Sequence, residues 1–197
     1  MPGISVSKIC VPFGGGGINW SSYWKTRHPE LATYTTGLTT PLSEAQIIRL
    51  GEFIEALKTG LSITNLSDAF DVMYILAGET AESSLRNLVK DAHYATAVNS
   101  PTFTAFEGFI SNGTSQYLKT GYIPSVNGSA YLLNSASMGC YTRTNNASGD
   151  VVEIGARTSL ENRDAFIQCF AFAPPANTVK ATLNSGQVLN LDITLLN

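Results

Sequence analysis

The sequence predicts a mainly β, α+β chain, in which an antiparallel β-sandwich follows an N-terminal extended arm and a helix. From residue 94 onward, short alternating or apolar runs are separated by turn signals such as Asn112-Gly113 and Asn127-Gly128, which is typical of all-β sandwiches. Only 14% of the 197 residues are charged, against about a quarter in an average protein. We expect an arm over residues 1–40, a helix-strand-helix segment over 41–92 and a β-sandwich module over 93–197.

The arm carries large aromatic residues beyond a glycine hinge. Residues 4–11 alternate in the manner of one strand, and Gly14–Gly17 then break regular structure because glycine leaves the backbone free. A short arm has little core of its own, so its aromatic residues need another surface to bury against. We predict that a neighbouring subunit supplies this surface, with packing on the chain's own body as the alternative. The predicted interface anchors are Phe13, Trp20, Tyr23 and Trp24.

The middle segment contains the clearest helix, over residues 42–59. Ser43 is a suitable N-cap, and Gln46 three residues later completes a capping-box pattern. An apolar stripe recurs at helical spacing, and Gly60 is expected to end the helix. The stripe consists of Ile47, Leu50, Ile54 and Leu57. We expect a buried strand over residues 71–76 and a second helix over 79–90, with Leu85, Leu88 and Val89 facing inward.

The β module is expected to contain many short strands. Their predicted ranges are 95–98, 102–106, 108–110, 115–120, 135–144, 151–156, 165–172, 177–183 and 188–196. The sequence stops soon after the last of these runs, so we expect that the sandwich is small, that another subunit completes it, or that the sequence is a fragment of a longer protein. An unfinished sheet leaves an open edge, and open edges pair with other chains. We therefore expect a homo-oligomer.

Catalytic and metal-binding patterns are not found in the sequence. His28 and His93 are the two histidines, and neither accompanies a G-x-S-x-G motif. Glycoside hydrolysis needs two facing carboxylates, and Glu153, Glu161 and Asp164 do not form the close cluster that sandwich glucanases use. Asp150 and Asp164 could supply oxygen ligands to calcium, but solvation of turns explains these residues better. We expect no enzyme activity, no catalytic residue, no metal and no cofactor.

The three cysteines and the charge pattern exclude other classes. Cys10, Cys140 and Cys169 are odd in number and widely spaced, so they indicate neither a disulfide framework nor a metal site. The net charge is −3 and no basic cluster exists, so nucleic acid is not an expected partner. No apolar run approaches the roughly 20 residues that span a membrane, and residues 1–13 do not resemble a secretory signal. The chain is therefore expected to fold in a cytoplasm.

Exposed aromatic residues on a sandwich can bind sugars. Tyr117, Tyr122 and Tyr131 are the candidates for such a ligand site. Packing in the core or in hairpins explains each of them more simply. A host surface glycan is therefore kept as a speculative partner.

Three stretches of the chain resemble a known family. They are DAFDVMYILAGET (residues 68–80), ATAVNSPTFTAFEGFISNGTSQYLKTGYIPS (95–125) and LLNSASMGCYTRTNNASGDVVEIGAR (132–157). The pattern is similar to laminin-G/concanavalin A-like domains in virion structural proteins of tailed bacteriophages and prophages. Residues 20–24, Trp-Ser-Ser-Tyr-Trp, also look like the opening of such proteins. The resemblance implies a jelly-roll sandwich in a virion, with possible glycan contact, and transfers no catalytic residue.

The expected function is that of a structural component of a bacteriophage virion, as a head fibre, a capsid decoration or a tail-associated protein. It would be assembled in the host cytoplasm, bind other virion proteins through its N-terminal arm and display the β-sandwich. One alternative is a carbohydrate-binding receptor-recognition module, an adhesin of a phage tail. A second is a glycan-degrading enzyme, which the lack of clustered carboxylates makes the weaker of the two. A bacterial surface protein is a third.

Overall fold

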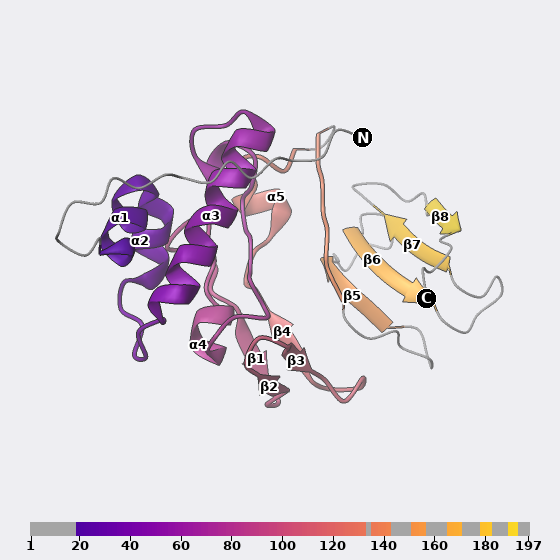
Figure 1. The fold of residues 1–197 in the computed structure, drawn as a ribbon. Helices are drawn as coiled ribbons and strands as arrows, with labels where there is room; N and C mark the ends of the chain where they lie inside the picture. Colours follow the sequence, from indigo (N-terminus) through magenta and orange to yellow (C-terminus); the bar gives the residue numbers. More distant parts are fainter. Residues whose placement is uncertain are drawn as a thin grey trace.

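The computed structural model describes residues 19–132 and 135–142 and four later strands, and it places most of the helices before the strands along the chain (Figure 1). The helical part contains α1 (Trp20–Arg27), α2 (Pro29–Thr35), α3 (Glu44–Leu61), the short 3-10 helix η1 (Leu66–Asp68) and α4 (Ala81–Ser84). The β part contains β1 (Thr96–Val98), β2 (Thr102–Thr104), β3 (Gly108–Ile110), β4 (Tyr117–Lys119), the short helix α5 (Pro124–Asn127), and then β5 (Val151–Ala156), β6 (Ala165–Phe170), β7 (Thr178–Thr182) and β8 (Leu189–Asp192).

Helix α3 begins as the sequence predicts. The Ser43 hydroxyl accepts a hydrogen bond from the backbone N–H of Gln46 at 3.3 Å, which satisfies one of the free donors of the first turn. The predicted end at Gly60 is wrong. The helix continues to Leu61, and Ser62 takes the left-handed conformation at φ 55°. Its backbone N–H donates to the carbonyls of the last turn, so the ending comes from local geometry and not from a glycine.

The core of the molecule lies where α1 and α2 pack on α3. It contains a cluster of buried residues: Trp24, Leu31, Tyr34, Leu42, Ile47, Leu50, Ile54, Leu66, Leu88 and Val89. Gly51 makes the closest packing in this core possible, because a Cβ there would lie 2.4 Å from the Trp24 ring. The predicted apolar stripe of α3 is confirmed, since Ile47, Leu50 and Ile54 are buried.

The prediction of an extended N-terminal arm over residues 1–40 is wrong where the structure describes it. Residues 20–35 form α1 and α2, and these helices bury Trp24, Leu31 and Tyr34 against the body. The reason is packing between helices, since α3 presents a glycine on which the Trp24 ring can lie. The predicted strand over residues 4–11 and the glycine hinge lie outside the described residues.

The predicted strand over 71–76 and the helix over 79–90 are also wrong. Residues 71–76 form no ladder, and α4 has only 4 residues. Asn87 explains the difference, because its Oδ1 accepts from the backbone N–H groups of Met73 at 3.0 Å and Val89 at 3.1 Å. These bonds, with Leu88 N–H donating to the Met73 carbonyl at 2.8 Å, tie the two segments together without regular structure. Leu88 and Val89 are nevertheless buried, as predicted.

The predicted β-sandwich is wrong, although most of its strands lie where the sequence places them. β1 pairs with β4, β2 pairs with β3, and β5 to β8 form one antiparallel meander in sequence order. The described strands thus form two small two-stranded ribbons and one single-layer sheet, and no second sheet faces the meander. The strands of the ribbons have 3 residues each, too short to build the facing layers of a sandwich. The fold is a mixed α+β arrangement with a helical N-terminal region.

The register of the four-stranded sheet lines up apolar residues across its strands. One row is Ile154, Ile167, Ala181 and Leu189, and the next is Val151, Cys169, Val179 and Leu191. The two rows are two residues apart on β6, β7 and β8, whereas on β5 a register shift between Val152 and Ile154 interrupts this spacing. The described helices stand away from this sheet in Figure 1. An apolar sheet face is normally covered by a second layer.

The predicted strand over 135–144 is described only to residue 142, and there it has no ladder. The segment runs as a long extended trace between the helical part and β5 (Figure 1). A single bridge between Leu132 and Ser135 marks its beginning. The described segment therefore has the shape of a strand without belonging to one of the described ladders.

Candidate functional site

The helical part and the β part of the molecule differ in the number of residues that they bury. The helical part holds the whole buried cluster of the core. Between residues 95 and 142, the described residues that are buried are Ala95, Pro101 and Gly108. A stretch of this length in a globular domain normally supplies several buried side chains to a core. The surface of this stretch is therefore the candidate site.

Large apolar side chains are exposed along the same stretch. They are Phe106, Ile110, Tyr117, Ile123, Val126, Leu132 and Tyr141, which we call the uncovered residues. Glu107 and Lys119 are the charged residues between positions 95 and 142. The cores of protein–protein interfaces are depleted in charge and enriched in aromatic residues. This surface can bind another protein surface more readily than it can bind a charged ligand.

Asp71 fixes the β part to the helical part. Its buried carboxylate accepts from Tyr122 Oη at 3.0 Å and from Ser129 Oγ at 2.6 Å. It also accepts from the backbone N–H groups of Ser129 at 2.9 Å, Ala130 at 3.1 Å and Tyr131 at 2.8 Å. We call this group the Asp71 clamp. Because charged acceptors form the stronger hydrogen bonds, the clamp defines where residues 122–131 lie.

The clamp holds Asp71 as a carboxylate. Burial alone would raise the pKa of Asp71, but the hydrogen bonds from Ser129, Tyr131 and Ala130 outweigh it and hold the pKa well below its usual range. The pKa of Tyr122 is raised by burial and by the neighbouring negative charge of Asp71. Both groups keep their protonation state near neutrality, so the clamp is a structural device. Sequence reasoning missed it, although an acidic residue inside the apolar run at 70–76 is a signal for a buried, bonded carboxylate.

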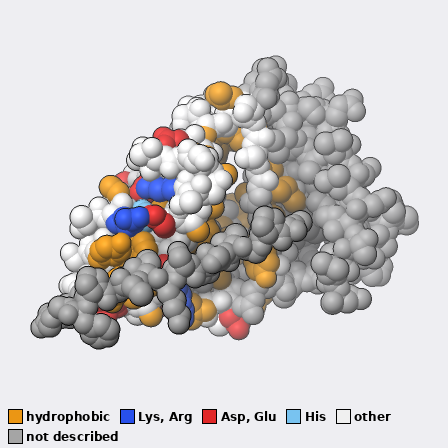
Figure 2. Space-filling view, turned by 45° about the horizontal axis from the view of Figure 1, so that its top comes forward, with side chains coloured by type: hydrophobic (Ala, Val, Ile, Leu, Met, Phe, Trp, Pro, Cys, Tyr) orange, Lys and Arg blue, Asp and Glu red, His pale blue; other side chains and the backbone are white. Residues whose placement is uncertain are grey.

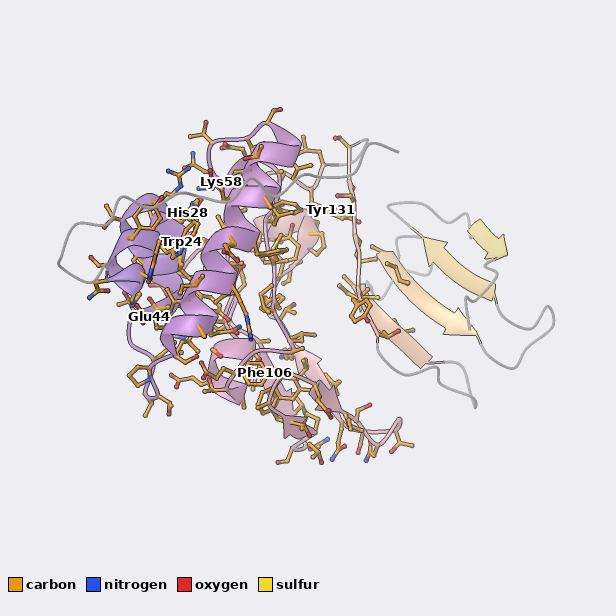
Figure 3. All side chains as sticks on the ribbon, viewed as in Figure 1. Trp24, His28, Glu44, Lys58, Phe106 and Tyr131 are labelled. Carbon is orange, nitrogen blue, oxygen red and sulfur yellow. The ribbon has the colours of Figure 1, made fainter. Side chains whose placement is uncertain are left out.

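The three tyrosines predicted as a speculative ligand site lie in two different surroundings. Tyr122 and Tyr131 meet at the Asp71 clamp, and the ring of His93 packs edge-on against Tyr122 at 5.6 Å. The Tyr131 hydroxyl is buried without a hydrogen-bond partner (Figure 3). Tyr117 is exposed on β4, away from this cluster. Of the three, Tyr117 is exposed, whereas Tyr122 and Tyr131 are partly buried.

The residues predicted as interface anchors differ in burial. Trp24 is only 4% exposed, so it cannot anchor the chain to a neighbour, and its indole stacks on His28 at 5.6 Å between ring centroids. Its ring packs on Gly51 of α3 instead, which is the physical reason for the correction. Trp20 is partly buried against the core, and Tyr23 is 40% exposed. Phe13 lies outside the described residues.

A cluster of charged side chains surrounds His28 at the junction of α1, α2 and α3. His28 is 2% exposed, and neither ring nitrogen forms a hydrogen bond, although Nε2 lies 3.3 Å from Glu55 Oε2. Arg27 pairs with Glu55, and Lys58 pairs with Glu30 at 2.9 Å. Figure 2 shows basic, acidic and histidine side chains close together on one face of the molecule.

The chemistry of this cluster is structural. Burial, aided by the nearby Lys58 charge, lowers the pKa of His28. The pKa of Glu55 is lowered first by its hydrogen bond with Arg27. The Glu30 carboxylate also accepts from the backbone N–H of Leu66 at 3.0 Å, which ties α2 to η1. His28 stays neutral near pH 7 and is stacked rather than exposed, so it is not placed to exchange protons with a substrate.

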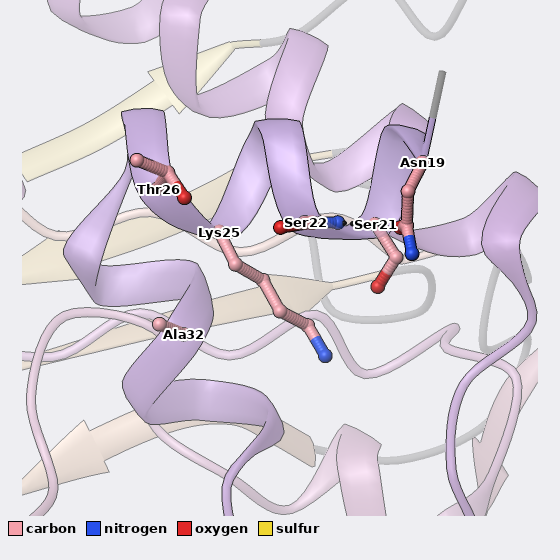
Figure 4. A pocket seen from close by; sticks show the side chains of 6 residues that line it. All are labelled: Asn19, Ser21, Ser22, Lys25, Thr26 and Ala32. Atoms are coloured by element: carbon pink, nitrogen blue, oxygen red, sulfur yellow. Dashed lines mark hydrogen bonds between the residues drawn. The ribbon is translucent and has the colours of Figure 1, made fainter. Parts of the chain in front are cut away.

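A shallow hollow of about 470 Å³ lies beside α1, and polar side chains line most of it (Figure 4). Its lining residues are Asn19, Ser21, Ser22, Lys25, Thr26 and Ala32. The Asn19 side chain is already used as the N-cap of α1, since its Oδ1 accepts from Ser22 N–H at 2.9 Å. The hollow offers one cation and no buried polar group, which is not the construction of an enclosed ligand site.

Metal binding and membrane crossing receive no support from the described residues. Among them, no three histidine, cysteine or acidic side chains gather into a group that could hold a metal ion. The helices in the same part of the chain include none that is long and apolar enough to span a bilayer.

Comparison with known proteins found no relative, since no family model, no curated protein and no solved structure matches the chain.

Proposed function

We propose that this chain is a non-catalytic structural subunit of a bacteriophage particle that assembles with other copies of itself and with other virion proteins. One observation carries the proposal. The described residues between 95 and 142 bury almost nothing and carry two charges, although the helical part beside them has a complete core. Apolar surface without charge is stabilised by contact with another protein surface.

The proposal transfers the assembly role from the N-terminal arm to the β part. Trp24 is committed to the chain's own core, whereas the uncovered residues lie on the ribbons, on α5 and along the extended segment. The helical part would then act as a folded body, and the Asp71 clamp would hold the assembly surface to it.

The assignment to a phage particle is supported by the three resembling stretches and by the low content of charged residues, at 14%. The β-sandwich that the resemblance implied is not formed by the described residues. The stretches at 95–125 and 132–157 nevertheless include much of the uncovered surface, so the resemblance concerns the part of the chain to which we assign assembly.

The test is the mass of the full-length chain in solution. We expect light scattering after gel filtration to give a defined homo-oligomer whose population increases with protein concentration. A monomer at every concentration up to about 100 μM, well above the affinities of stable oligomers, would contradict the assembly role. Mass spectrometry of purified phage particles from the source culture tests the virion assignment separately, because the chain should be found in the particles.

A further inference from the structure

We propose that Asn112 is a site of spontaneous covalent modification, at which the backbone nitrogen of Gly113 displaces ammonia from the Asn112 side chain. The sequence contains two Asn-Gly pairs, at residues 112–113 and 127–128. An asparagine side chain can be attacked by the backbone nitrogen of the next residue, and glycine leaves that nitrogen unhindered because it has no Cβ. The fold gives the two pairs opposite surroundings. This chemistry does not depend on the proposed function.

The Asn112 side-chain oxygen lies among backbone donors. Asn112 Oδ1 accepts hydrogen bonds from the N–H groups of Thr114 at 3.1 Å, Ser115 at 3.0 Å and Gln116 at 3.1 Å. These donors face the negative charge that develops on Oδ1 when a nucleophile adds to Cγ. Fixed N–H donors aimed at a developing oxyanion lower the barrier to acyl transfer. The loop therefore activates its own asparagine.

The attacking nitrogen is accessible. Asn112 and Gly113 are both exposed, and a Cβ on Gly113 would have nothing within 4 Å. The Gly113 N–H donates a hydrogen bond to Ser111 Oγ at 3.4 Å, which is longer than the usual range for such bonds. This weak bond leaves the N–H open to deprotonation by solvent.

The reaction needs no co-reactant except water. A bond forms between Gly113 N and Asn112 Cγ, and the proton of the nitrogen passes to solvent. The bond between Cγ and Nδ2 then breaks and ammonia leaves. The Ser115 hydroxyl, 3.1 Å from Nδ2, can donate the proton that this nitrogen takes up. Water opens the resulting cyclic imide at either carbonyl, which leaves aspartate or isoaspartate at position 112, and no atom is oxidised or reduced.

Asn127 and Gly128 show the protected form of the same pair. The Gly128 N–H donates to the Pro124 carbonyl at 3.1 Å, at the end of α5. A Cβ on Gly128 would lie 2.5 Å from that carbonyl oxygen and 2.6 Å from the carbonyl oxygen of Tyr131, so the backbone is closely packed here. Asn127 Oδ1 accepts from the N–H of Ile123 at 2.9 Å. Attack by the Gly128 nitrogen therefore requires a backbone hydrogen bond to break first.

Peptide mapping of the full-length chain, stored in mildly alkaline buffer, tests the inference. Trypsin separates the two pairs, since Lys119 lies between them. We expect the peptide with Asn112 to gain the mass difference between a carboxamide and a carboxylate, and to contain isoaspartate. Because a backbone hydrogen bond protects the second pair, Asn112 should react at least about fivefold faster than Asn127. Equal rates in the folded protein would overturn the inference.

The chain unfolded in urea is the reference for the effect of the fold. The two pairs should react there at similar rates, because the structure that distinguishes them is lost. The same ratio of rates in urea as in the folded protein would assign the difference to local sequence and overturn the inference. A rate at Asn112 that folding lowers as strongly as it lowers the rate at Asn127 would also overturn it, because the loop would then protect rather than activate.

Two matched variants assign the mass change to one residue. Asn112→Gln should abolish the change in its peptide and leave the rate at Asn127 as it is in the wild type. Asn127→Gln is the control and should leave the rate at Asn112 unchanged. The tryptic peptide that contains Asn112 also contains Asn99. A mass change that persists in Asn112→Gln would therefore belong to Asn99 and contradict the assignment.

Discussion

The helical part and the β part of this molecule are built on different principles. The helical part buries ten apolar residues in one cluster that holds α1, α2 and α3 together. The β part is held mainly by strand pairing and by the Asp71 clamp, and between residues 95 and 142 its described residues supply little to any core. Two-stranded ribbons are at best marginally stable in water without a packed face. The comparison teaches that one part of the chain is a finished fold, whereas the other leaves apolar side chains exposed, which in the proposed function another protein surface covers.

The largest change in stability is expected when the aromatic side chain at the centre of the helical core is removed. Trp24→Ala should lower the free energy of unfolding by about 3–5 kcal/mol, because a large buried ring is replaced by a cavity. The matched control is Tyr23→Ala, since the neighbouring ring is 40% exposed and its removal should cost less than about 1 kcal/mol. Chemical denaturation measures both. Equal costs would mean that the Trp24 ring is not buried in this core.

A second change cuts the connection between the two parts. Asp71→Asn should cost about 2–3 kcal/mol, since the charged acceptor of a buried network is replaced by a weaker, neutral one. Glu52→Gln on the exposed face of α3 is the control and should cost less than about 0.5 kcal/mol. Hydrogen exchange should show that residues 129–131 lose protection in the Asp71 variant while α3 keeps it. Loss of protection in α3 to the same degree would mean that the two parts unfold as one.

The same carboxylate predicts a pH dependence. The pKa of Asp71 is lowered by folding from an ordinary value of 3.8, so the unfolded state binds a proton more readily. The stabilisation is fully present above this value and is lost as the pH falls below it. Wild type should therefore lose stability between about pH 4.5 and pH 2.5 more steeply than Asp71→Asn does. Parallel pH profiles of the two proteins in urea titrations would argue against the clamp.

His28 gives a smaller pH effect confined to the helical part. Its pKa is lowered by burial from the ordinary 6.5, so protonation favours the unfolded chain and stability decreases as the pH falls below 6.5. His28→Gln should flatten this part of the profile, whereas His93→Asn, at the other histidine, should leave it in place. Thermal unfolding between about pH 7 and pH 5 provides the measurement. A profile unchanged by His28→Gln would contradict the burial of this ring.

The smallest expected effect is at the uncovered residues. Val126→Ser on α5 should change the unfolding free energy of the monomer by less than about 0.5 kcal/mol, because its side chain is 74% exposed. The buried Ile54→Val, a milder change in chemistry, should cost about 0.5–1.5 kcal/mol. The outcome to watch for is a larger loss of unfolding free energy from Val126→Ser than from Ile54→Val in a chain kept monomeric. It would mean that the β part has a core of its own, contrary to this comparison.

Local patterns in the sequence were sufficient where structure depends on neighbours along the chain. The start of α3 follows from Ser43 and Gln46, and the positions of most strands follow from alternation. Helix α3 runs past Gly60, because a glycine is tolerated inside a helix whose ending is set two residues later. The sequence patterns did not predict contacts between distant residues. The Trp24 ring packs on Gly51, and the Asp71 carboxylate accepts hydrogen bonds from residues 58 to 60 positions later. A sandwich requires facing layers, and alternation alone carries no information about which strands face one another.

The Asp71 clamp has a mechanical consequence. Its five donors converge on one carboxylate: four belong to the chain between Ser129 and Tyr131, and the fifth is the hydroxyl of Tyr122. A tensile load applied to the strands beyond residue 135 enters the helical body at this point, where several bonds must rupture together rather than one after another. The extended segment can therefore bear tension while the helices behind it remain folded.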